Sequence, residues 1–266
     1  MQHLFGSWVP FSAEIKAASR VLLLSDYDGT LTPIVSRPDK AILSSEVREK
    51  LRALAANPAF SVGIISGRSL SEVKSLVAVE GIYYAGNHGF EIEGPGIKFV
   101  HPAAKAAQPA IQDLLRQLSA ELDNIKGAFV EDKGVSLSVH YRLVRKSDEE
   151  TVAQLFHQIT SPWLRDGRIM VTSGKKVWEV RPPAEWHKGK AVETIMQEMK
   201  SLLSGGQMLT IYLGDDTTDE DAFRVIHRWR GWSIFVGPGN SSSSAGYFLN
   251  STSEVETFLS RLLELK

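Results

Sequence analysis

Two acidic residues directly follow an apolar run near the start of the chain, and their spacing raises a chemical question. In LLLSDYDGTLTP (residues 22–33), Asp26 and Asp28 lie two positions apart, and Gly29 follows them. Two carboxylates at short range repel each other unless a cation or a proton offsets them. The stretch is therefore either a solvated turn or a site that needs both acids.

Polar residues also follow three other apolar runs. They are Ser66, Gly67 and Arg68 after residues 60–65, Asn87, His88 and Gly89 after residues 82–86, and Asp215, Asp216 and Asp219 after the run that ends at Gly214. Lys188 stands at the start of a predicted helix. In open parallel sheets, ligands bind beyond the carboxyl ends of the strands. We therefore expect these groups to share one edge of a sheet.

The residue types at these positions suit chemistry on a phosphoryl group. A carboxylate can attack phosphorus and form an aspartyl-phosphate, which divides hydrolysis into two easier steps, and Asp26 is the candidate nucleophile. Asp28 is the candidate general acid and base, which protonates the leaving oxygen and then activates water. Ser66, Gly67 and Lys188 are candidates to hold the remaining phosphate oxygens.

This chemistry calls for a divalent cation, because carboxylates repel a phosphate dianion. A magnesium ion (Mg²⁺) prefers a few carboxylates together with waters and phosphate oxygens. The candidate ligands are Asp26, Asp215 and the backbone carbonyl of Asp28, with Asp216 or Asp219 in support. Mg²⁺ is therefore the predicted cofactor.

Each motif has a simpler interpretation when it is taken alone. Asp-x-Asp-Gly is often a solvated turn, Ser66 could cap a helix, the acids at 215–219 suit a helix start, and Lys188 could be solvated. The four groups occur together at the ends of predicted elements, which favours the phosphoryl-transfer interpretation. Lys190 is an alternative to Lys188 as the phosphate ligand.

Alternating apolar and amphipathic segments must position these residues. Strands are predicted at 20–26, 60–67 and 82–89 with helices at 44–57 and 69–77 between them, and then a helix at 188–203, a strand at 207–216, a helix at 219–227 and a strand at 232–237. This alternation predicts the α/β class, with a doubly wound parallel-sheet (Rossmann-like) core.

The middle of the chain interrupts that pattern. It contains a predicted helix at 108–122, strands at 127–134 and 135–144, a helix at 148–160, and strands at 168–174 and 175–182. This order is typical of a compact α+β module. We therefore expect a core of residues 1–100 and 179–266 with an inserted α+β cap domain of residues 101–178.

The core motifs resemble those of the haloacid dehalogenase-like phosphatase superfamily. An apolar strand leading into DxDGT, a hydroxyl at the second strand end, a lysine and a GDD…D loop occur in that superfamily's order between residues 26 and 219. The acid at position 28 resembles phosphatases and mutases rather than dehalogenases. The position of the insertion resembles the superfamily's α/β type of cap.

Further stretches resemble trehalose-6-phosphate phosphatases in particular. They are GNHGFE (86–91), VEDKGVSLSVHYR (130–142), VWEVRP (177–182) and GDDTTDEDAF (214–223). The resemblance implies that the substrate binds to Glu131, Lys133, Arg142 and Glu179 in the insertion and to Arg68, Asn87, His88 and Gly89 in the core. The alternative is structural: a solvated strand face for Glu131 and Lys133, and an ion pair between Arg142 and Glu179.

Together these features predict a phosphoric monoester hydrolase that converts the small-molecule sugar phosphate trehalose 6-phosphate to trehalose and phosphate with Mg²⁺. The alternatives are a phosphatase for sucrose 6-phosphate or mannosyl-3-phosphoglycerate, a phosphohexomutase, and a non-catalytic sugar-phosphate sensor. A trehalose-6-phosphate synthase is the expected functional partner.

Composition narrows the remaining classes. The 266 residues are 43% hydrophobic and 23% charged with a formal net charge of −1, as in ordinary globular proteins, and this charge favours neither nucleic acid nor a membrane as partner. The absence of cysteine excludes disulfides and thiolate metal sites. Since there is no signal-peptide pattern, and no apolar run of the roughly 18 residues that a bilayer requires, we expect a cytoplasmic protein.

Overall fold

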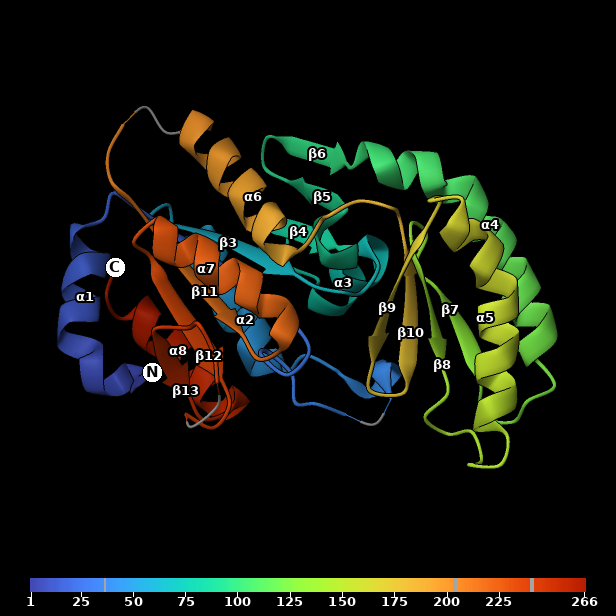
Figure 1. Cartoon of the computed structure of the whole chain (residues 1–266). Coiled ribbons are helices and arrows are strands. Elements are labelled where there is room, and N and C mark those ends of the chain that lie inside the picture. The colour runs from blue at the N-terminus through green and yellow to red at the C-terminus, as the bar shows by residue number, and fades with distance from the viewer. Residues whose placement is uncertain (36, 203–204, 240–241) are drawn as a thin grey trace. The chain divides into compact units, whose positions relative to one another are not determined.

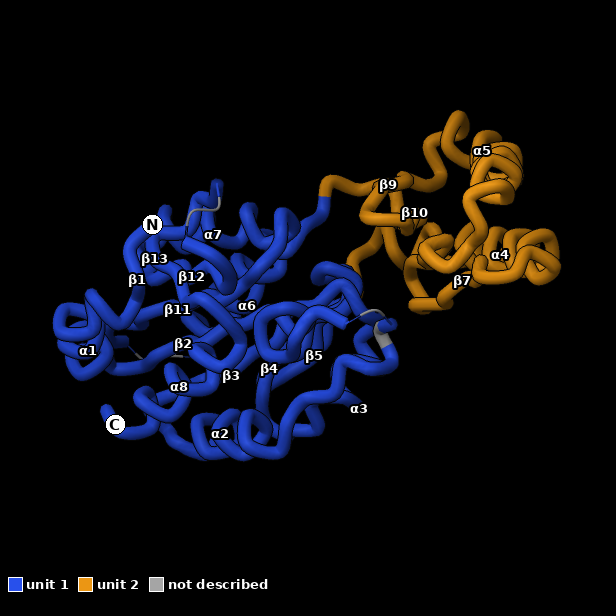
Figure 2. The backbone as a smooth tube through the Cα atoms, turned by 90° about the horizontal axis from the view of Figure 1, so that it is seen from below, with its two compact units in different colours: residues 1–99, 186–266 blue, residues 100–185 orange. Residues whose placement is uncertain are grey.

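The computed structural model of the chain describes residues 1–35, 37–202, 205–239 and 242–266. It contains two compact units, one of residues 1–99 and 186–266 (unit 1) and one of residues 100–185 (unit 2), coloured separately in Figure 2. The predicted boundary at 178/179 cuts through strand β10 (Val177–Arg181). That strand pairs with two other strands of unit 2, so the unit continues to Glu185.

A large β-sheet forms the centre of unit 1 (Figure 1). Its strands are β1 (Gln2–His3), β2 (Arg20–Ser25), β3 (Phe60–Ile65), β4 (Tyr83–Gly86), β5 (Glu91–Gly94), β6 (Ile97–Val100), β11 (Met208–Gly214), β12 (Trp232–Val236) and β13 (Tyr247–Leu249). Their spatial order is β1-β13-β12-β11-β2-β3-β4-β5-β6. The pairs from β1 to β4 are parallel, and β5 runs antiparallel to β4.

Helices cover both faces of this sheet. They are α1 (Trp8–Ala17), α2 (Ser45–Ala56), α3 (Leu70–Val77), α6 (Lys188–Leu202), α7 (Glu220–Arg228) and α8 (Thr252–Leu263). Helices α1, α2, α3 and α8 share a core with one face, and α6 and α7 share a core with the other (Figure 1). Since β2 contributes Val21 and Leu23 to the first core and Leu22 and Leu24 to the second, its residues 21–24 must all be apolar. The predicted doubly wound α/β fold is confirmed.

In unit 2, two amphipathic helices pack on one face of an antiparallel sheet. Its further elements are α4 (Pro102–Leu122), β7 (Phe129–Asp132), β8 (Leu137–His140), α5 (Glu149–Arg165) and β9 (Met170–Gly174). The sheet order is β7-β8-β10-β9. Alternate residues such as Val139 and Val180 pack with α4 and α5, which leaves the other face of the sheet without a helix of this unit. The predicted α+β insertion is confirmed.

The structure also contains elements that the sequence patterns do not reveal. Helices α1 and α8 and the hairpin of β5 and β6 have no counterpart in the sequence prediction, and α4 begins at Pro102 rather than at residue 108. Pro102 suits the first helical turn, where its missing N–H costs nothing. The predicted end of α6 at Leu203 lies outside the described residues.

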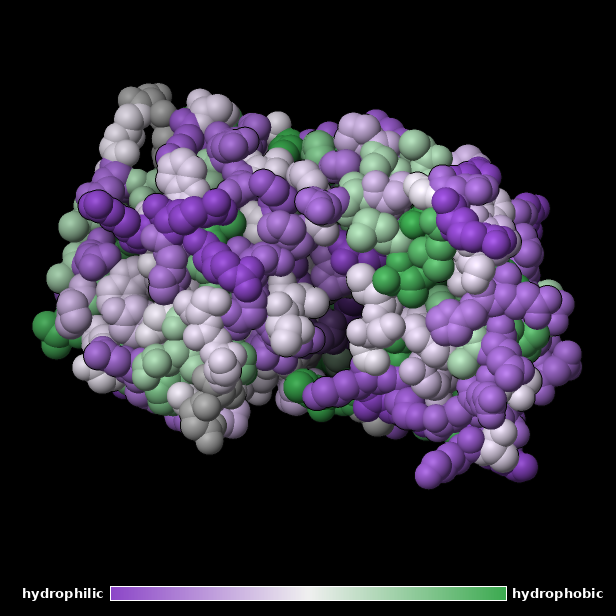
Figure 3. Space-filling view, in the orientation of Figure 1, coloured by the Kyte–Doolittle hydropathy of each residue, from purple (hydrophilic) through white to green (hydrophobic). Residues whose placement is uncertain are grey.

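The polarity of the surface and the lengths of the helices relate to how the protein meets its surroundings. On the face drawn in Figure 3, hydrophilic residues cover most of each unit, and hydrophobic residues form only small groups. In the part of the chain that the structure describes, no helix combines the length and the apolar character needed to cross a membrane.

Candidate active site

The candidate residues of unit 1 follow four neighbouring parallel strands. Asp215 comes directly after β11, Asp26 after β2 and Ser66 after β3, while Asn87 follows β4. These strands lie side by side in the order β11-β2-β3-β4, so their carboxyl ends share one edge of the sheet. This is the edge at which open α/β sheets bind their ligands.

Lys188, the first residue of α6, connects two of the acids. Its Nζ donates to Asp26 Oδ1 at 2.7 Å and to Asp219 Oδ1 at 2.8 Å, and all three residues are buried. The alternative, Lys190, is exposed and pairs with Glu193 at 3.2 Å. Of the two lysines, Lys188 is therefore the one in position to act together with Asp26.

Asp215 occupies a place that only a glycine neighbour permits. A Cβ added to Gly29 would lie 2.1 Å from Asp215 Oδ2, and the φ of Gly29 is +86°, a value that L side chains rarely adopt. Thr30 Oγ1 donates to Asp215 Oδ1 at 3.4 Å. The Asp-Gly-Thr sequence thus leaves room for the carboxylate of Asp215 beside the turn that follows β2.

The negative charges at this edge outnumber the positive ones. Burial raises the pKa of Asp26 well above its usual value although Lys188 opposes the shift. Burial, and then the charge of Asp219, raise the pKa of Asp215 from 3.8 to about 7. Burial alone would lower the pKa of Lys188, but Asp219 and Asp26 more than offset it and raise that pKa. One ammonium therefore faces three carboxylates.

These residues fit a divalent cation. Asp26, Asp215 and Asp219 have carboxylate oxygens within 4.8 Å of one another, and of the three only Asp219 has both oxygens engaged by two described donors each, so Asp26 and Asp215 are the better candidate ligands. Hard oxygen donors of this kind suit Mg²⁺. Asp216 is exposed, and its carboxylate caps the turn at Thr217, where it accepts from the hydroxyl at 3.0 Å. Its predicted part in metal binding stays a prediction.

Asp28 is held by an arginine that follows the neighbouring strand. Arg68 Nε donates to Asp28 Oδ2 at 2.8 Å and Arg68 Nη2 donates to Asp28 Oδ1 at 2.7 Å. The same guanidinium pairs with Glu72 and lies 5.4 Å from the centre of the Tyr27 ring. Arg68 therefore contacts the candidate acid and base itself, a role that the sequence analysis did not assign to it.

The ends of β3 and β4 interlock through backbone hydrogen bonds. The backbone N–H of Asn87 donates to the carbonyl of Arg68 at 2.7 Å, and that of His88 donates to the carbonyl of Ser66 at 2.9 Å. Asn87 and His88 have positive φ angles, and a Cβ on Gly67 would lie 2.7 Å from the His88 ring. The Ser66 hydroxyl accepts from the N–H of Arg68 at 3.1 Å, and among the described residues it donates to no acceptor, so its proton can serve a ligand.

Polar residues gather on the helix-free face of the sheet in unit 2. Glu131 and His140 pair at 2.7 Å, Lys133 Nζ donates to Glu179 at 3.4 Å, and Arg181 Nε lies 3.9 Å from Glu179. These side chains are 13–22% exposed. Three of the four predicted residues of the insertion therefore lie together, and His140 and Arg181 join them. Alternation along β8 and β10 could have indicated both additions.

Arg142, the fourth predicted residue of the insertion, makes a different contact. It lies beyond the end of β8, is exposed, and donates from Nη2 to the backbone carbonyl of Lys175 at 3.0 Å. The alternative of an ion pair between Arg142 and Glu179 is not what the described contacts show, since Glu179 pairs with Lys133. A sugar-binding role for Arg142 stays a prediction.

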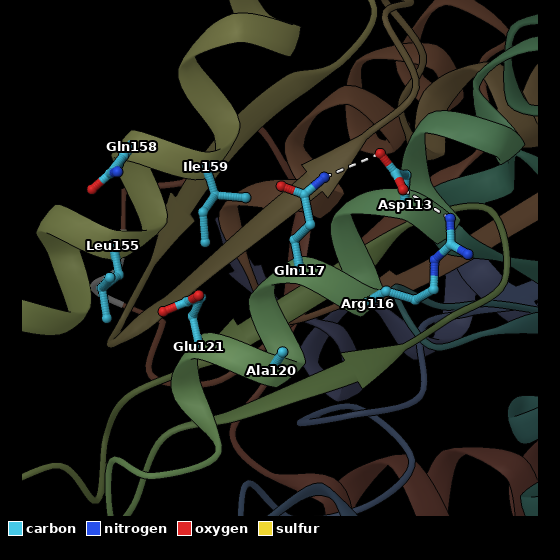
Figure 4. A pocket seen from close by; sticks show the side chains of 8 residues that line it. All are labelled: Asp113, Arg116, Gln117, Ala120, Glu121, Leu155, Gln158 and Ile159. Carbon is cyan, nitrogen blue, oxygen red and sulfur yellow. Dashed lines mark hydrogen bonds and ion pairs between the residues drawn. The ribbon is translucent and has the colours of Figure 1, made fainter.

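A separate groove of about 610 Å³ lies between α4 and α5 (Figure 4). Its lining residues are Asp113, Arg116, Gln117, Ala120, Glu121, Leu155, Gln158 and Ile159. Asp113 accepts hydrogen bonds from Arg116 and Gln117 at one end of it (Figure 4). None of these residues belongs to the candidate site.

Comparisons with known proteins agree with this geometry. The sequence model of the trehalose-phosphatase family matches residues 24–253. "Probable trehalose-phosphate phosphatase D" of Arabidopsis thaliana is 38% identical over 96% of this chain and 70% of its own length. "Probable trehalose-phosphate phosphatase 4" of Oryza sativa subsp. japonica is 37% identical over 95% of this chain and 69% of its own length.

Solved structures share the whole fold. The C-terminal domain of C. albicans trehalose-6-phosphate phosphatase superimposes with a TM-score of 0.78 at 26% identity and covers 97% of both chains. A haloacid dehalogenase-like hydrolase from Bacteroides thetaiotaomicron, at 15% identity, shares the fold with a TM-score of 0.62 over 91% of this chain and 99% of its own. The chain therefore belongs to the trehalose-phosphatase family and is a phosphoric monoester hydrolase.

Proposed function

We propose that this protein hydrolyses trehalose 6-phosphate to trehalose and inorganic phosphate through an aspartyl-phosphate on Asp26, with Mg²⁺ as cofactor. One observation carries the proposal. The buried carboxylate of Asp26 is held by Lys188 at 2.7 Å, and its ligand oxygen lies within 4.8 Å of that of Asp215. This arrangement supplies a nucleophile, a cation for phosphate and a metal ligand at one point.

In the first step, Asp26 attacks the phosphorus atom. Lys188 binds one carboxylate oxygen and leaves the other to form the new O–P bond. The bond between phosphorus and the sugar oxygen breaks, and Asp28 gives its proton to that leaving oxygen. The guanidinium of Arg68 donates to both oxygens of Asp28. The side chain of Asp28 must therefore move away from Arg68 before it can act as an acid.

In the second step, water regenerates the enzyme. Asp28, now a carboxylate, accepts a proton from a water molecule while the oxygen of that water attacks phosphorus. The bond between Asp26 and phosphorus breaks, and inorganic phosphate leaves. Lys188 and the hydroxyl of Ser66 hold non-bridging phosphate oxygens through both steps.

Asp26 and Asp215 would hold the metal ion, with the backbone carbonyl of Asp28 as a further ligand. Bound Mg²⁺ supplies positive charge that offsets the repulsion between these carboxylates and the phosphate. The excess of acids over Lys188 supports this assignment, since it leaves negative charge that a cation can neutralise.

We further propose that the polar face of unit 2 binds the sugar. Glu131, Lys133 and Glu179 present acceptors and donors on one side of an antiparallel sheet, as recognition of many hydroxyl groups requires. Trehalose 6-phosphate offers hydroxyls on both glucose rings. The relatives' names point to the same substrate class, and a trehalose-6-phosphate synthase would supply it.

A phosphate-release screen tests the function. The purified chain is assayed with trehalose 6-phosphate, sucrose 6-phosphate, mannosyl-3-phosphoglycerate and glucose 6-phosphate, with Mg²⁺ and with a chelator. We expect release from trehalose 6-phosphate at a kcat/KM at least about tenfold above that for the others, and only with the metal. Preference for another ester would reassign the substrate, and isomerisation without phosphate release would indicate a mutase.

A further inference from the structure

Tyr212 places a hydroxyl group inside the acidic cluster. It lies in the middle of β11, and its side chain packs in the core that this sheet forms with α6 and α7. Its hydroxyl donates to Asp219 Oδ1 at 2.6 Å, and Tyr212 and Asp219 are both fully buried. The ring of Tyr212 fills the core while its hydroxyl reaches Asp219, a combination that suits a tyrosine because its side chain is apolar except at the tip.

Asp219, the partner of Tyr212, uses both of its carboxylate oxygens. Oδ1 accepts from Tyr212 and from Lys188, and Oδ2 accepts from the backbone N–H groups of Asp215 and Asp216, each at 3.1 Å. Four donors leave this carboxylate little capacity for a metal ion. Asp219 therefore fixes the positions of two other parts of the site. One oxygen holds the ammonium of Lys188, and the other holds the loop that carries Asp215.

We infer that Tyr212 is a positioning residue for phosphoryl transfer: its hydroxyl fixes Asp219 and thereby fixes Lys188 and the metal-binding loop at Asp215. The inference rests on the proposed function, because it assigns Tyr212 to the same reaction. In this assignment Tyr212 acts through Asp219 rather than as a ligand of the substrate or of the metal ion. Its effect reaches the reaction through a chain of two short contacts, from its hydroxyl to Asp219 and from Asp219 to Lys188.

The surroundings keep Tyr212 in the donating form. Burial, and then the charges of Asp219 and Asp26, raise the pKa of Tyr212 well above its usual value. The hydroxyl keeps its single proton and donates it to Asp219. It shares Oδ1 with the lysine, so removal of the hydroxyl leaves Lys188 as the only described donor to that oxygen and draws the ammonium from Asp26 toward Asp219.

The test is Tyr212→Phe, which keeps the ring and removes only the hydroxyl. Losing a partner that orients a metal-site residue typically costs about 10- to 100-fold in affinity or activity. We expect kcat for trehalose 6-phosphate to fall about tenfold and KM to stay within about twofold. In the absence of substrate, calorimetric titration with MgCl₂ should show Mg²⁺ binding weakened by about tenfold.

Tyr84→Phe is the matched control. Tyr84 is also a buried tyrosine of unit 1, and its hydroxyl donates to the backbone carbonyl of Val79 at 2.7 Å, away from the acids. The Tyr84 hydroxyl also accepts from the backbone N–H of Val79 at 3.1 Å, so Tyr84→Phe loses two buried hydrogen bonds and Tyr212→Phe loses one. We therefore expect Tyr84→Phe to lower the melting temperature at least as much as Tyr212→Phe. Only Tyr212→Phe should change kcat and the Mg²⁺ affinity. Equal kcat and equal Mg²⁺ affinity in the two variants would overturn the inference.

A second variant keeps the test decisive if Tyr212→Phe does not fold. Asp219→Asn retains the size of the side chain but weakens its hold on Lys188, and we expect the same loss of kcat and of Mg²⁺ affinity. Wild-type values in that variant would contradict the inference. Failure of the proposed function is distinguishable, because the wild-type chain would then release no phosphate from trehalose 6-phosphate, while the Mg²⁺ titrations would still compare the variants.

Discussion

At the scale of single residues, the two acids of the Asp-Tyr-Asp stretch have different partners. Asp26 is buried and contacts Lys188, whereas the side chain of Asp28 is 43% exposed and is clamped by Arg68. The repulsion between them is therefore offset by two separate cations. A buried carboxylate beside a lysine suits a nucleophile, and a more exposed carboxylate suits a group that must take protons from and give protons to substrate and water.

Asp215 makes the stability of the metal-free protein depend on pH. Its pKa in the folded chain is about 7, above the ordinary 3.8, so folding favours the protonated form. Its contribution to stability is therefore complete below about pH 4 and is lost as the pH rises through about 7. We expect the melting temperature of the chelator-treated protein to fall by several degrees from about pH 5 to about pH 8.

Added Mg²⁺ should reverse this trend, since the ion binds the ionised carboxylates. Differential scanning calorimetry with and without MgCl₂ measures both effects, and the gain from the metal should be larger at about pH 8 than at about pH 5. Asp215→Asn is the control, because it removes the titrating group and should flatten the pH dependence. A metal-free protein whose stability rises over this range would contradict the assignment.

At the scale of elements, the site depends on close contacts between strand ends and α6. The turn Asn87–Gly89 follows β4, and a Cβ on Gly89 would lie 2.4 Å from Ala191 Cβ in α6. Since Lys188 begins that helix, the contact helps set the height of the lysine above the sheet. The glycine also has a φ of +96°, so two independent reasons exclude a larger residue.

Gly89→Ala should therefore destabilise the protein more than an alanine at a glycine with free space. Gly81 is the matched position, because its φ is +74° but no atom lies within 4 Å of its added Cβ. Both variants carry the backbone strain, and the overpacking at Gly89 adds about 1–3 kcal/mol. Denaturant unfolding monitored by circular dichroism measures the difference. Equal midpoints for the two variants would show that α6 yields freely at this contact.

The sequence could predict those elements whose burial pattern is simple. The strand 20–25, with its apolar run 21–24, and the amphipathic helix 45–56 are predictable because burial on two faces or on one face sets their residue types. The hairpin of β5 and β6 is not, since its four-residue strands are too short to show a period. In the candidate site, the acids could be identified from the sequence because carboxylates are unusual at the end of an apolar strand. Tyr212 could not, since it follows the apolar pattern of β11 and only the folded chain brings its hydroxyl to Asp219.

At the scale of the whole molecule, the two units divide the work in the proposed function. Unit 1 carries the nucleophile, the phosphate ligands and the metal ligands, and unit 2 carries the polar sheet face of Glu131 and Glu179. Changes in unit 2 should therefore act on sugar recognition alone, and changes among the acids of unit 1 should act on every phosphate ester.

Glu179→Gln tests this division of roles. We expect its KM for trehalose 6-phosphate to rise about tenfold, because a carboxylate that accepts from hydroxyls is lost, while turnover of p-nitrophenyl phosphate stays within about twofold. Glu150→Gln, an exposed position on α5, should change neither. Steady-state kinetics on both substrates provide the comparison, and a parallel loss on both esters in Glu179→Gln would refute the proposed division.

The most direct test of the central claim is phosphate release from trehalose 6-phosphate by the wild-type chain and by Asp26→Asn, both in Mg²⁺. The amide keeps the size of the side chain and can still accept from Lys188, so the fold should persist, as the melting temperature would verify. We expect turnover by the wild type and a decrease of at least about 10⁴-fold in the variant. Comparable rates in the two proteins, or no release by the wild type, would contradict it.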